Sequence, residues 1–151
     1  MVITTLCYLE KDNKLLMLNR NKKAHDLNHG KWIGVGGKLE LHESPDEGII
    51  REIKEETNYD ALKVKLVGII TFVLPKWQDE LCFVYTCDKF SGEMKQSDEG
   101  YLEWIDREKI FDLTLWEGDR YFLPKVINHE FFDVKLVYDL DDKLVAVKDQ
   151  D

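Results

Sequence analysis

The sequence GKLELHESPDEGIIREIKEETNY, residues 37–59, carries the clearest local structural signals in the chain. Ser44 suits a helix N-cap, Pro45 suits the first helical position, and Glu47 would complete a capping box with Ser44. Asn58 tolerates the left-handed conformation in which many helices end. We therefore predict a helix over residues 45–57, whose buried face carries four residues at helical spacing: Ile49, Ile50, Ile53 and Thr57.

Three glutamates, Glu52, Glu55 and Glu56, share one flank of this predicted helix beside its apolar face. Like charges at this spacing repel each other, and the last turn of a helix disfavours anions because of the helix dipole. A divalent cation would offset both costs, and carboxylate oxygens suit Mg²⁺ or Mn²⁺ better than zinc. A solvated acidic face is the simpler explanation if these three residues are taken alone.

The residues around these glutamates resemble the signature of the Nudix hydrolases. The matching positions are Gly37, Glu43 after five residues, and, after seven more, Arg51, Glu52, Ile53, Glu55, Glu56 and Tyr59. One position differs, because Asn58 stands where the family has glycine. Asparagine adopts the same backbone conformation, so we expect this difference to affect stability more than chemistry.

The resemblance also implies a role for each site residue. It implies a metal site formed by Glu52, Glu55, Glu56, the carbonyl of Gly36 and the downstream acid Glu99. Glu99 is equally well explained as a solvated loop carboxylate. Arg51 and Glu43 would support the geometry of the loop and helix, with Glu55 as a second partner of Arg51. Arg20 and Lys38 are candidates for phosphate contacts, and Glu52 is our choice of general base.

The bulk properties of the chain indicate one domain, residues 1–151, with a sizeable core. The chain has 151 residues, 44% of them hydrophobic, and a net charge of −9. This charge argues against non-specific nucleic-acid binding and against an anionic membrane surface. Three scattered cysteines, no signal-peptide pattern and an uncharged run of only residues 66–75 favour a cytoplasmic protein.

Hydrophobic patterning predicts a mixed β-sheet sandwiched between helices, an α/β (α+β) arrangement. Glycines alternate with Trp32, Ile33 and Val35 in residues 30–37, which indicates a short strand that something approaches closely. The other predicted strands cover residues 2–9, 14–19, 62–74, 81–89, 102–105, 132–139 and 143–147. Helical segments are predicted over residues 106–111 and 116–126, with Pro124 in the last turn or at a kink. The resemblance implies the Nudix fold over nearly the whole chain.

The segment from residue 14 to residue 38 has a positive net charge, although the whole protein is acidic. It contains one acid, Asp26, and six basic residues: Lys14, Arg20, Lys22, Lys23, Lys31 and Lys38. Such a loop beside the acidic helix suits a polyphosphate, whereas an ordinary solvated loop is the alternative without that helix.

Two segments, residues 30–38 and residues 116–122, resemble the MutT-related enzymes that remove 8-oxo-dGTP, particularly the animal type. Trp116 and Asp119 match the tryptophan that stacks on the base and an aspartate that binds its edge. The alternative is that Trp116 caps the core and Asp119 suits the first turn of a helix. This chain has Ile33 where the animal enzymes have asparagine, and Gly118 before Asp119 where they have a second aspartate. We therefore expect hydrolysis of purine nucleoside triphosphates to the monophosphate and pyrophosphate, with weaker selection of oxidised guanine.

Other functions remain open at this point. ADP-ribose or another nucleoside diphosphate derivative is the first alternative, for which Pro75 is a weak indication because a turn explains it more simply. A non-catalytic nucleotide-binding module is the second, although all the metal glutamates are present. Trimming of RNA 5′ triphosphates is disfavoured by the acidic surface.

Overall fold

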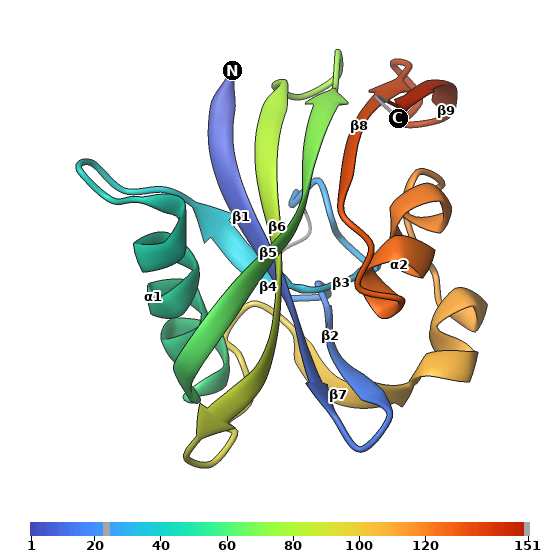
Figure 1. Cartoon of the computed structure of the whole chain (residues 1–151). Helices are drawn as coiled ribbons and strands as arrows, with labels where there is room; N and C mark the ends of the chain where they lie inside the picture. Colours follow the sequence, from blue (N-terminus) through green and yellow to red (C-terminus); the bar gives the residue numbers. More distant parts are fainter. Residues whose placement is uncertain (23–24, 150–151) are drawn as a thin grey trace.

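The structure is a computed structural model that describes residues 1–22 and 25–149, so Lys23 lies outside the described residues. It forms one mixed sheet with helices on both of its faces, as predicted (Figure 1). The strands are β1 (Val2–Lys11), β2 (Lys14–Asn19), β3 (Trp32–Ile33), β4 (Val35–Lys38), β5 (Asp60–Val73), β6 (Glu80–Ser91), β7 (Tyr101–Asp106), β8 (Phe132–Tyr138) and β9 (Leu144–Asp149). The helices are α1 (Pro45–Thr57), the 3₁₀ helix η1 (Arg107–Asp112) and α2 (Asp119–Ile127).

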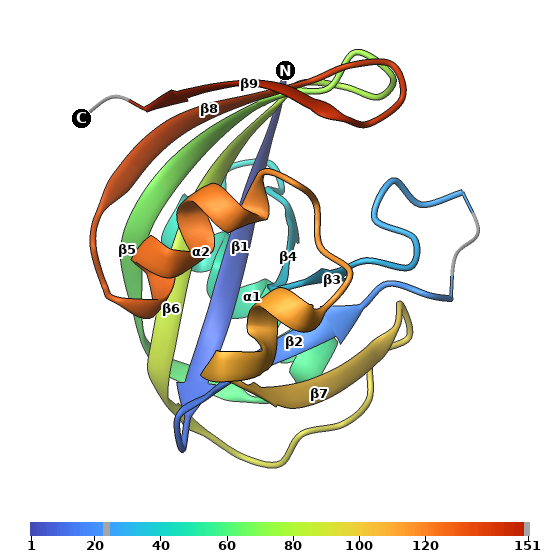
Figure 2. The same ribbon diagram turned by 90° about the vertical axis from the view of Figure 1, so that its right-hand side faces the viewer.

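Strand β1 lies at the centre of the sheet and has three neighbours. The strand order is β3-β2-β1-β6-β5-β8-β9, while β4 also pairs with β1 and β7 with β2. The β1–β6 and β5–β8 pairs are parallel, and the others are antiparallel. Figure 2 shows β8, β5, β6 and β1 side by side with α2 across them.

The two faces of the sheet bury separate hydrophobic clusters, because successive strand residues point to opposite faces. Cys7 and Leu9 of β1 pack in the cluster that contains Ile49 and Ile53 of α1. Tyr8, between them, packs in the cluster that contains α2. The alternation along a single strand thus places α1 and α2 on opposite sides of β1.

Helix α1 has the predicted start and end. Ser44 Oγ accepts a hydrogen bond from the Glu47 backbone at 3.2 Å, and Glu47 Oε1 accepts one from the Ser44 backbone at 3.0 Å. Asn58 has a φ of 70° and caps the C-terminus. The prediction for Ile50 is wrong, since its side chain is 41% exposed. At about 100° per residue, Ile50 lies a quarter-turn or more away from the face on which its neighbour Ile49 is buried.

The glycine-rich segment forms two short strands, β3 and β4, where one was predicted. The expected close approach is confirmed at Gly36, because a Cβ there would overlap the carbonyl oxygen of Thr5 on β1. Helix α2 begins at Asp119, three residues later than predicted, and contains Pro124 in its last turns. Among the described residues, no helix is long and apolar enough to cross a bilayer.

Candidate active site

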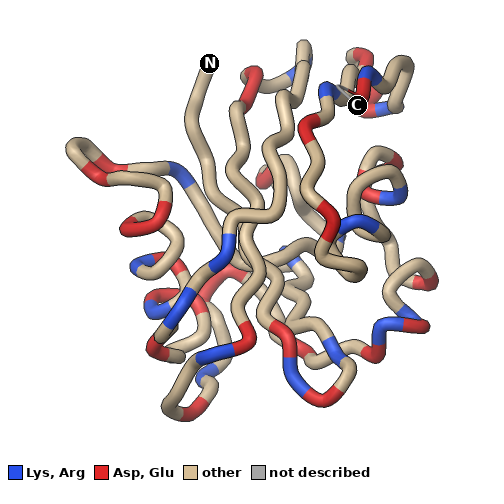
Figure 3. Tube along the Cα trace, viewed as in Figure 1, with Lys and Arg blue, Asp and Glu red and all other residues tan. Residues whose placement is uncertain are grey.

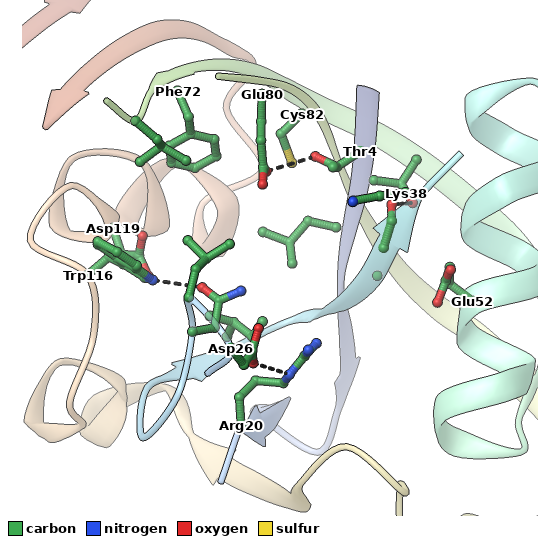
Figure 4. Close-up of a pocket in the computed structure, with 18 of the residues that line it drawn as sticks. Thr4, Arg20, Asp26, Lys38, Glu52, Phe72, Glu80, Cys82, Trp116 and Asp119 are labelled. Atoms are coloured by element: carbon green, nitrogen blue, oxygen red, sulfur yellow. Dashed lines mark hydrogen bonds and ion pairs between the residues drawn. The ribbon is translucent and has the colours of Figure 1, made fainter. Parts of the chain in front are cut away.

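A cavity of about 720 Å³ brings most of the predicted site residues together (Figure 4). Its lining includes Arg20, Ile33, Gly36, Gly37, Lys38, Glu52, Glu99, Trp116 and Asp119. Four predicted residues do not line it: Glu43, Arg51, Glu55 and Glu56. Among its predicted site residues, the acidic helix therefore contributes only Glu52 to the cavity lining.

The Arg51 guanidinium binds several carboxylates next to the cavity. It donates to Glu43 through Nε at 2.7 Å and Nη2 at 2.9 Å, and through Nη1 to Glu52 at 2.9 Å and Glu55 at 3.2 Å. Arg51 also donates to the backbone carbonyl of Lys38 at 3.2 Å. Both predicted pairings of Arg51 are thus present in the structure. The pKa of Glu43 is lowered to about 2, and the hydrogen bonds from Arg51 are the largest cause.

Glu56 is buried outside the cavity lining, with 6% of its surface exposed. Its Oε2 accepts a hydrogen bond from the Gly36 backbone at 2.8 Å, while Oε1 is buried with no donor among the described residues. Burial, followed by the neighbouring Glu99 carboxyl, raises the pKa of Glu56 to about 9. Two facing carboxyl groups need a proton or a cation between them, because each can only accept hydrogen bonds when it is ionised.

Glu52 faces the glycine-rich strand β4. A Cβ on Gly37 would lie 2.6 Å from Glu52 Oε1, so glycine leaves the space that this carboxylate occupies. Burial raises the pKa of Glu52, and its bond to Arg51 acts in the opposite direction. Glu55 is different, since its side chain is 57% exposed. Its role as a metal ligand stays a prediction.

The donor types at this end of the cavity fit a hard divalent cation. The potential ligand atoms are carboxylate oxygens, which suit Mg²⁺. One of them, Glu56 Oε1, is buried and accepts no hydrogen bond from the described residues. In the described part of the chain, no group of three or more acidic, histidine or cysteine side chains is already arranged around one point. Arg51 binds Glu52 and Glu55 in this arrangement. Metal binding would therefore require these two side chains to exchange a guanidinium contact for the ion.

The basic segment places part of its charge at the cavity. Arg20 forms ion pairs of 2.9 Å with Asp26 and with Glu99, and all three residues line the cavity. Lys38 also lines it, with an exposed side chain. Lys22 instead donates to the carbonyl of Ser97 at 2.7 Å. Figure 3 shows acidic and basic residues alternating along α1, so the local charge at this end is mixed.

The far end of the cavity is aromatic. Trp116 is 7% exposed, lies edge-on to Tyr138 with ring centroids 5.1 Å apart, and donates through Nε1 to Asn28 Oδ1 at 2.8 Å. Lys31 Nζ lies 4.8 Å from the centroid of the same indole ring. Trp116 therefore belongs to the core and lines the cavity as well, and Asn28 orients it.

Asp119 is a buried acid at this aromatic end. It lies in the first turn of α2 with 4% of its surface exposed, and it lines the cavity. Burial raises its pKa to about 8, while Lys31 and Arg120 act in the opposite direction. Burial thus favours the neutral form of Asp119, and a protonated carboxyl can donate one hydrogen bond and accept others.

The cavity also contains residues that the sequence analysis did not identify. Thr4 and Tyr8 of β1, Phe72 of β5, and Glu80 and Cys82 of β6 line its floor. Of these residues, Glu80 is the one that most needs a functional explanation, because burying a carboxyl group on the inward face of a strand costs free energy unless it has a partner. The signal was present in the sequence as a Glu-x-Cys alternation, but the parallel pairing of β1 with β6 could not be read from it.

Comparison with known proteins is consistent with this site. The family model for the NUDIX domain matches residues 2–126. An uncharacterized Nudix hydrolase of Bacillus subtilis is 32% identical, over 79% of this chain and 75% of that protein. An oxidized purine nucleoside triphosphate hydrolase of Danio rerio is 26% identical, over 86% of this chain and 82% of that protein.

Two further similarities concern substrate and structure. An ADP-ribose pyrophosphatase of Methanocaldococcus jannaschii is 31% identical, over 70% of this chain and 59% of that protein. The crystal structure of a MutT protein from Bacillus halodurans has a TM-score of 0.88 and 26% identity to this chain. The match covers 99% of this chain and 98% of the chain in that structure. Nudix hydrolases generally use divalent metal ions. The matched model, the motif on α1 and the shared fold together show that this chain belongs to the Nudix hydrolase family.

Proposed function

We propose that this protein hydrolyses purine nucleoside triphosphates, releasing the nucleoside monophosphate and pyrophosphate. The observation that carries the proposal is one cavity that joins the carboxylate of Glu52 on α1 to an aromatic wall with a buried acid. A nucleotide has the same order, with charged phosphates at one end and a flat base at the other. The 26% identity to an oxidized purine nucleoside triphosphate hydrolase supports the same substrate class.

Mg²⁺ is the ion that we propose for this site, with Mn²⁺ as a substitute. Glu52, Glu56 and Glu99 would hold it, with Glu55 and the Gly36 carbonyl as further ligands. When bound, the ion would neutralise the phosphate oxygens and acidify water for attack on phosphorus. Glu52 lines the cavity and is our choice to accept the proton of that water.

We propose that two cationic side chains bind the phosphates. Lys38 and Arg20 line the cavity on the side of Glu52, and Arg20 is held there by Asp26 and Glu99. We assign Arg51 and Glu43 to positioning, because their bonds fix the carboxylates of α1.

At the other end, Trp116 would stack on a purine and Asp119 would bind its edge. The neutral Asp119 carboxyl can both donate to and accept from the N–H and carbonyl groups of a guanine-like base. Ile33 lines the same space and offers no hydrogen bond. We propose that 8-oxo-dGTP is a substrate and that the protein removes oxidised nucleotides from a cytoplasmic pool, a compartment that its three free, buried cysteines support.

The test is a product assay with Mg²⁺ on 8-oxo-dGTP, dGTP, dATP and ADP-ribose, reporting kcat/KM and the phosphate products. We expect the triphosphates to give a monophosphate and pyrophosphate, with 8-oxo-dGTP preferred modestly over dGTP. Faster cleavage of ADP-ribose to AMP would favour the activity named for the Methanocaldococcus jannaschii relative. Binding of nucleotides without any turnover would indicate a non-catalytic module.

A further inference from the structure

Glu80 has no role in the site as described so far, yet it lines the cavity. It begins strand β6, its side chain is half-buried, and it points into the cavity beside Phe72 and Thr4 (Figure 4). Among the described residues, its carboxylate accepts one hydrogen bond, from Thr4 Oγ1 at 3.3 Å. A half-buried carboxylate can accept several hydrogen bonds, so Glu80 has capacity for a further donor from the cavity.

The sheet register places Glu80 on the opposite side of Thr4 from Lys38. Thr4 pairs with Lys38 on β4 and with Cys82 on β6, and Glu80 pairs with Phe72 on β5. Moving across the sheet from α1, the cavity floor therefore presents Lys38, then Thr4, then Glu80 and Phe72.

Electrostatic effects agree with this placement. Burial raises the pKa of Glu80, while the hydrogen bond from Thr4 and the charge of Lys38 act in the opposite direction. On the other side, Glu80 and Asp119 both act on the Cys82 thiol, whose pKa burial raises to about 12. Glu80 thus interacts electrostatically with Lys38, on the proposed phosphate side. It also affects Cys82, which Asp119 on the proposed base side affects as well.

We propose that Glu80 recognises the sugar of the bound nucleotide, its carboxylate accepting hydrogen bonds from the sugar hydroxyls. The inference rests on the proposed function, since it takes the phosphates to lie beside Glu52 and the purine beside Trp116. The sugar joins these two groups, so it lies over the part of the floor where Glu80 and Thr4 meet. Thr4 is a positioning residue in this arrangement, because its hydroxyl holds one carboxylate oxygen and leaves the other for the ligand.

A carboxylate is well suited to this task. Vicinal hydroxyls of a ribose can both donate to one carboxylate, whereas a deoxyribose offers a single donor there. Hydrogen bonds to a charged group contribute more than those between neutral groups, and the contribution grows where water is excluded. Glu80 therefore makes turnover sensitive to the number of sugar hydroxyls, independently of how the base is recognised.

The experiment combines removal of the carboxylate with removal of its expected partners. The kcat/KM values of GTP, dGTP and 2′,3′-dideoxyGTP are measured for the wild type, Glu80→Ala and Glu80→Gln with Mg²⁺. In the wild type we expect kcat/KM to fall about ten-fold or more from GTP to the dideoxy compound. In Glu80→Ala the fall should shrink to about two-fold, and Glu80→Gln, which keeps an uncharged acceptor, should lie between them.

Two controls keep the result specific. Glu93→Ala removes an exposed carboxylate elsewhere and should leave the dependence on sugar hydroxyls unchanged. ITP, which lacks the 2-amino group of GTP, is compared with GTP in each variant, and that ratio should not change in Glu80→Ala. Melting temperatures show that each variant is folded under the assay conditions, and Glu80→Gln preserves the shape of the side chain if the alanine variant is unstable.

Each possible result decides the matter. Equal sensitivity to sugar hydroxyls in the wild type and in both folded variants overturns the inference. A changed GTP-to-ITP ratio with unchanged sugar dependence would mean that Glu80 contacts the base. If the wild type hydrolyses none of these nucleotides, the proposed function fails and the inference fails with it, whereas wild-type turnover separates the two.

Discussion

The backbone N–H of Gly36 donates a hydrogen bond of 2.8 Å to Oε2 of Glu56, joining strand β4 to the last turns of α1. The bond orients a buried carboxylate whose Oε1 accepts no hydrogen bond from the described residues. A glycine is required at this point, because a side chain would overlap Thr5. The position of one candidate metal ligand is thus set by backbone and not by a flexible partner.

Glu56→Gln should abolish Mg²⁺-dependent turnover, with a loss of at least a hundred-fold in kcat. The amide retains the oxygen that accepts from Gly36 but loses the negative charge a metal ion requires. The melting temperature should change by only a few degrees, because no volume is removed. Glu55→Gln, at an exposed position outside the cavity lining, should lose less activity. Retained turnover in folded Glu56→Gln would remove Glu56 from the metal site.

Arg51→Lys should lower kcat/KM by about ten-fold or more. An ammonium group cannot reproduce the pair of hydrogen bonds to Glu43, at 2.7 and 2.9 Å, while also holding Glu52. We also expect a loss of about 1–3 kcal/mol in the free energy of unfolding, measured by denaturant titration. Lys54→Ala, on the exposed side of the same helix, is the matched control. Equal activity in Arg51→Lys and the control would contradict a positioning role.

Asp119 should make the stability of the protein depend on pH. Between its ordinary pKa of 3.8 and the folded value of about 8, the folded protein keeps a proton that the unfolded chain has released. The free energy of unfolding therefore decreases as pH rises through this range, and this decrease ends above pH 8. Asp119→Asn removes the titrating group, so its melting temperature should exceed that of the wild type increasingly from pH 5 to pH 8.

The measurement is a series of melting curves for both proteins at equal ionic strength. Subtracting the two series cancels the other buried acids, such as Glu56, which are common to both. A difference that does not change between pH 5 and pH 8 would show that Asp119 is already ionised near its ordinary pKa.

Asn28→Ala should raise the KM for purine triphosphates several-fold with a small effect on melting temperature. The indole of Trp116 would lose the acceptor at 2.8 Å that fixes its orientation, but it would remain packed against Tyr138. This variant is more informative than Trp116→Ala, which would remove a large core side chain and cost about 3–5 kcal/mol. Asn28→Asp keeps an acceptor for the indole and should largely preserve KM. An unchanged KM in Asn28→Ala would leave Trp116 as a core residue only.

Ile33→Asn should increase the preference for 8-oxo-dGTP over dGTP. Ile33 lines the base end of the cavity and is half-buried. An asparagine amide there would bind the edge of a matching base, and it would be left without a hydrogen-bond partner when a poorly matching base is bound. The readout is the ratio of the two kcat/KM values, with Ile33→Val as the control for lost volume. An unchanged ratio would mean that this position does not contact the base.

The sequence predicted α1 closely because its signals are local. Ser44 and Glu47 form the expected capping box, and Asn58 adopts the expected left-handed conformation. Ile50 was misplaced because a run of two isoleucines does not reveal which one faces the sheet until the helix is packed. The contact of Arg51 with Glu55 was anticipated for the same local reason, since Glu55 lies four residues away along the helix, whereas its contact with Glu43 was expected from the family resemblance.

The floor of the cavity could not be predicted in this way. Thr4 and Glu80 are 76 residues apart, and only the parallel pairing of β1 with β6 brings them together. The sequence also did not show that Trp116 both packs in the core and lines the cavity, because its partner Asn28 comes from a loop 88 residues earlier. Contacts of this range depend on strand register and loop path, which hydrophobic patterning does not encode.

The pairing of β1 has a consequence for the order in which the chain can fold. Its first residues reach their parallel partner only when β6, from Glu80 to Ser91, is available. During synthesis from the N-terminus, the edge of β1 that pairs with β6 therefore stays unpaired until more than half of the chain has been made. Pairing over so long a loop also slows folding, since the chain loses entropy before the contact forms. Completion of the cavity floor is thus expected late in folding, so hydrolase activity should appear only after the global folding step.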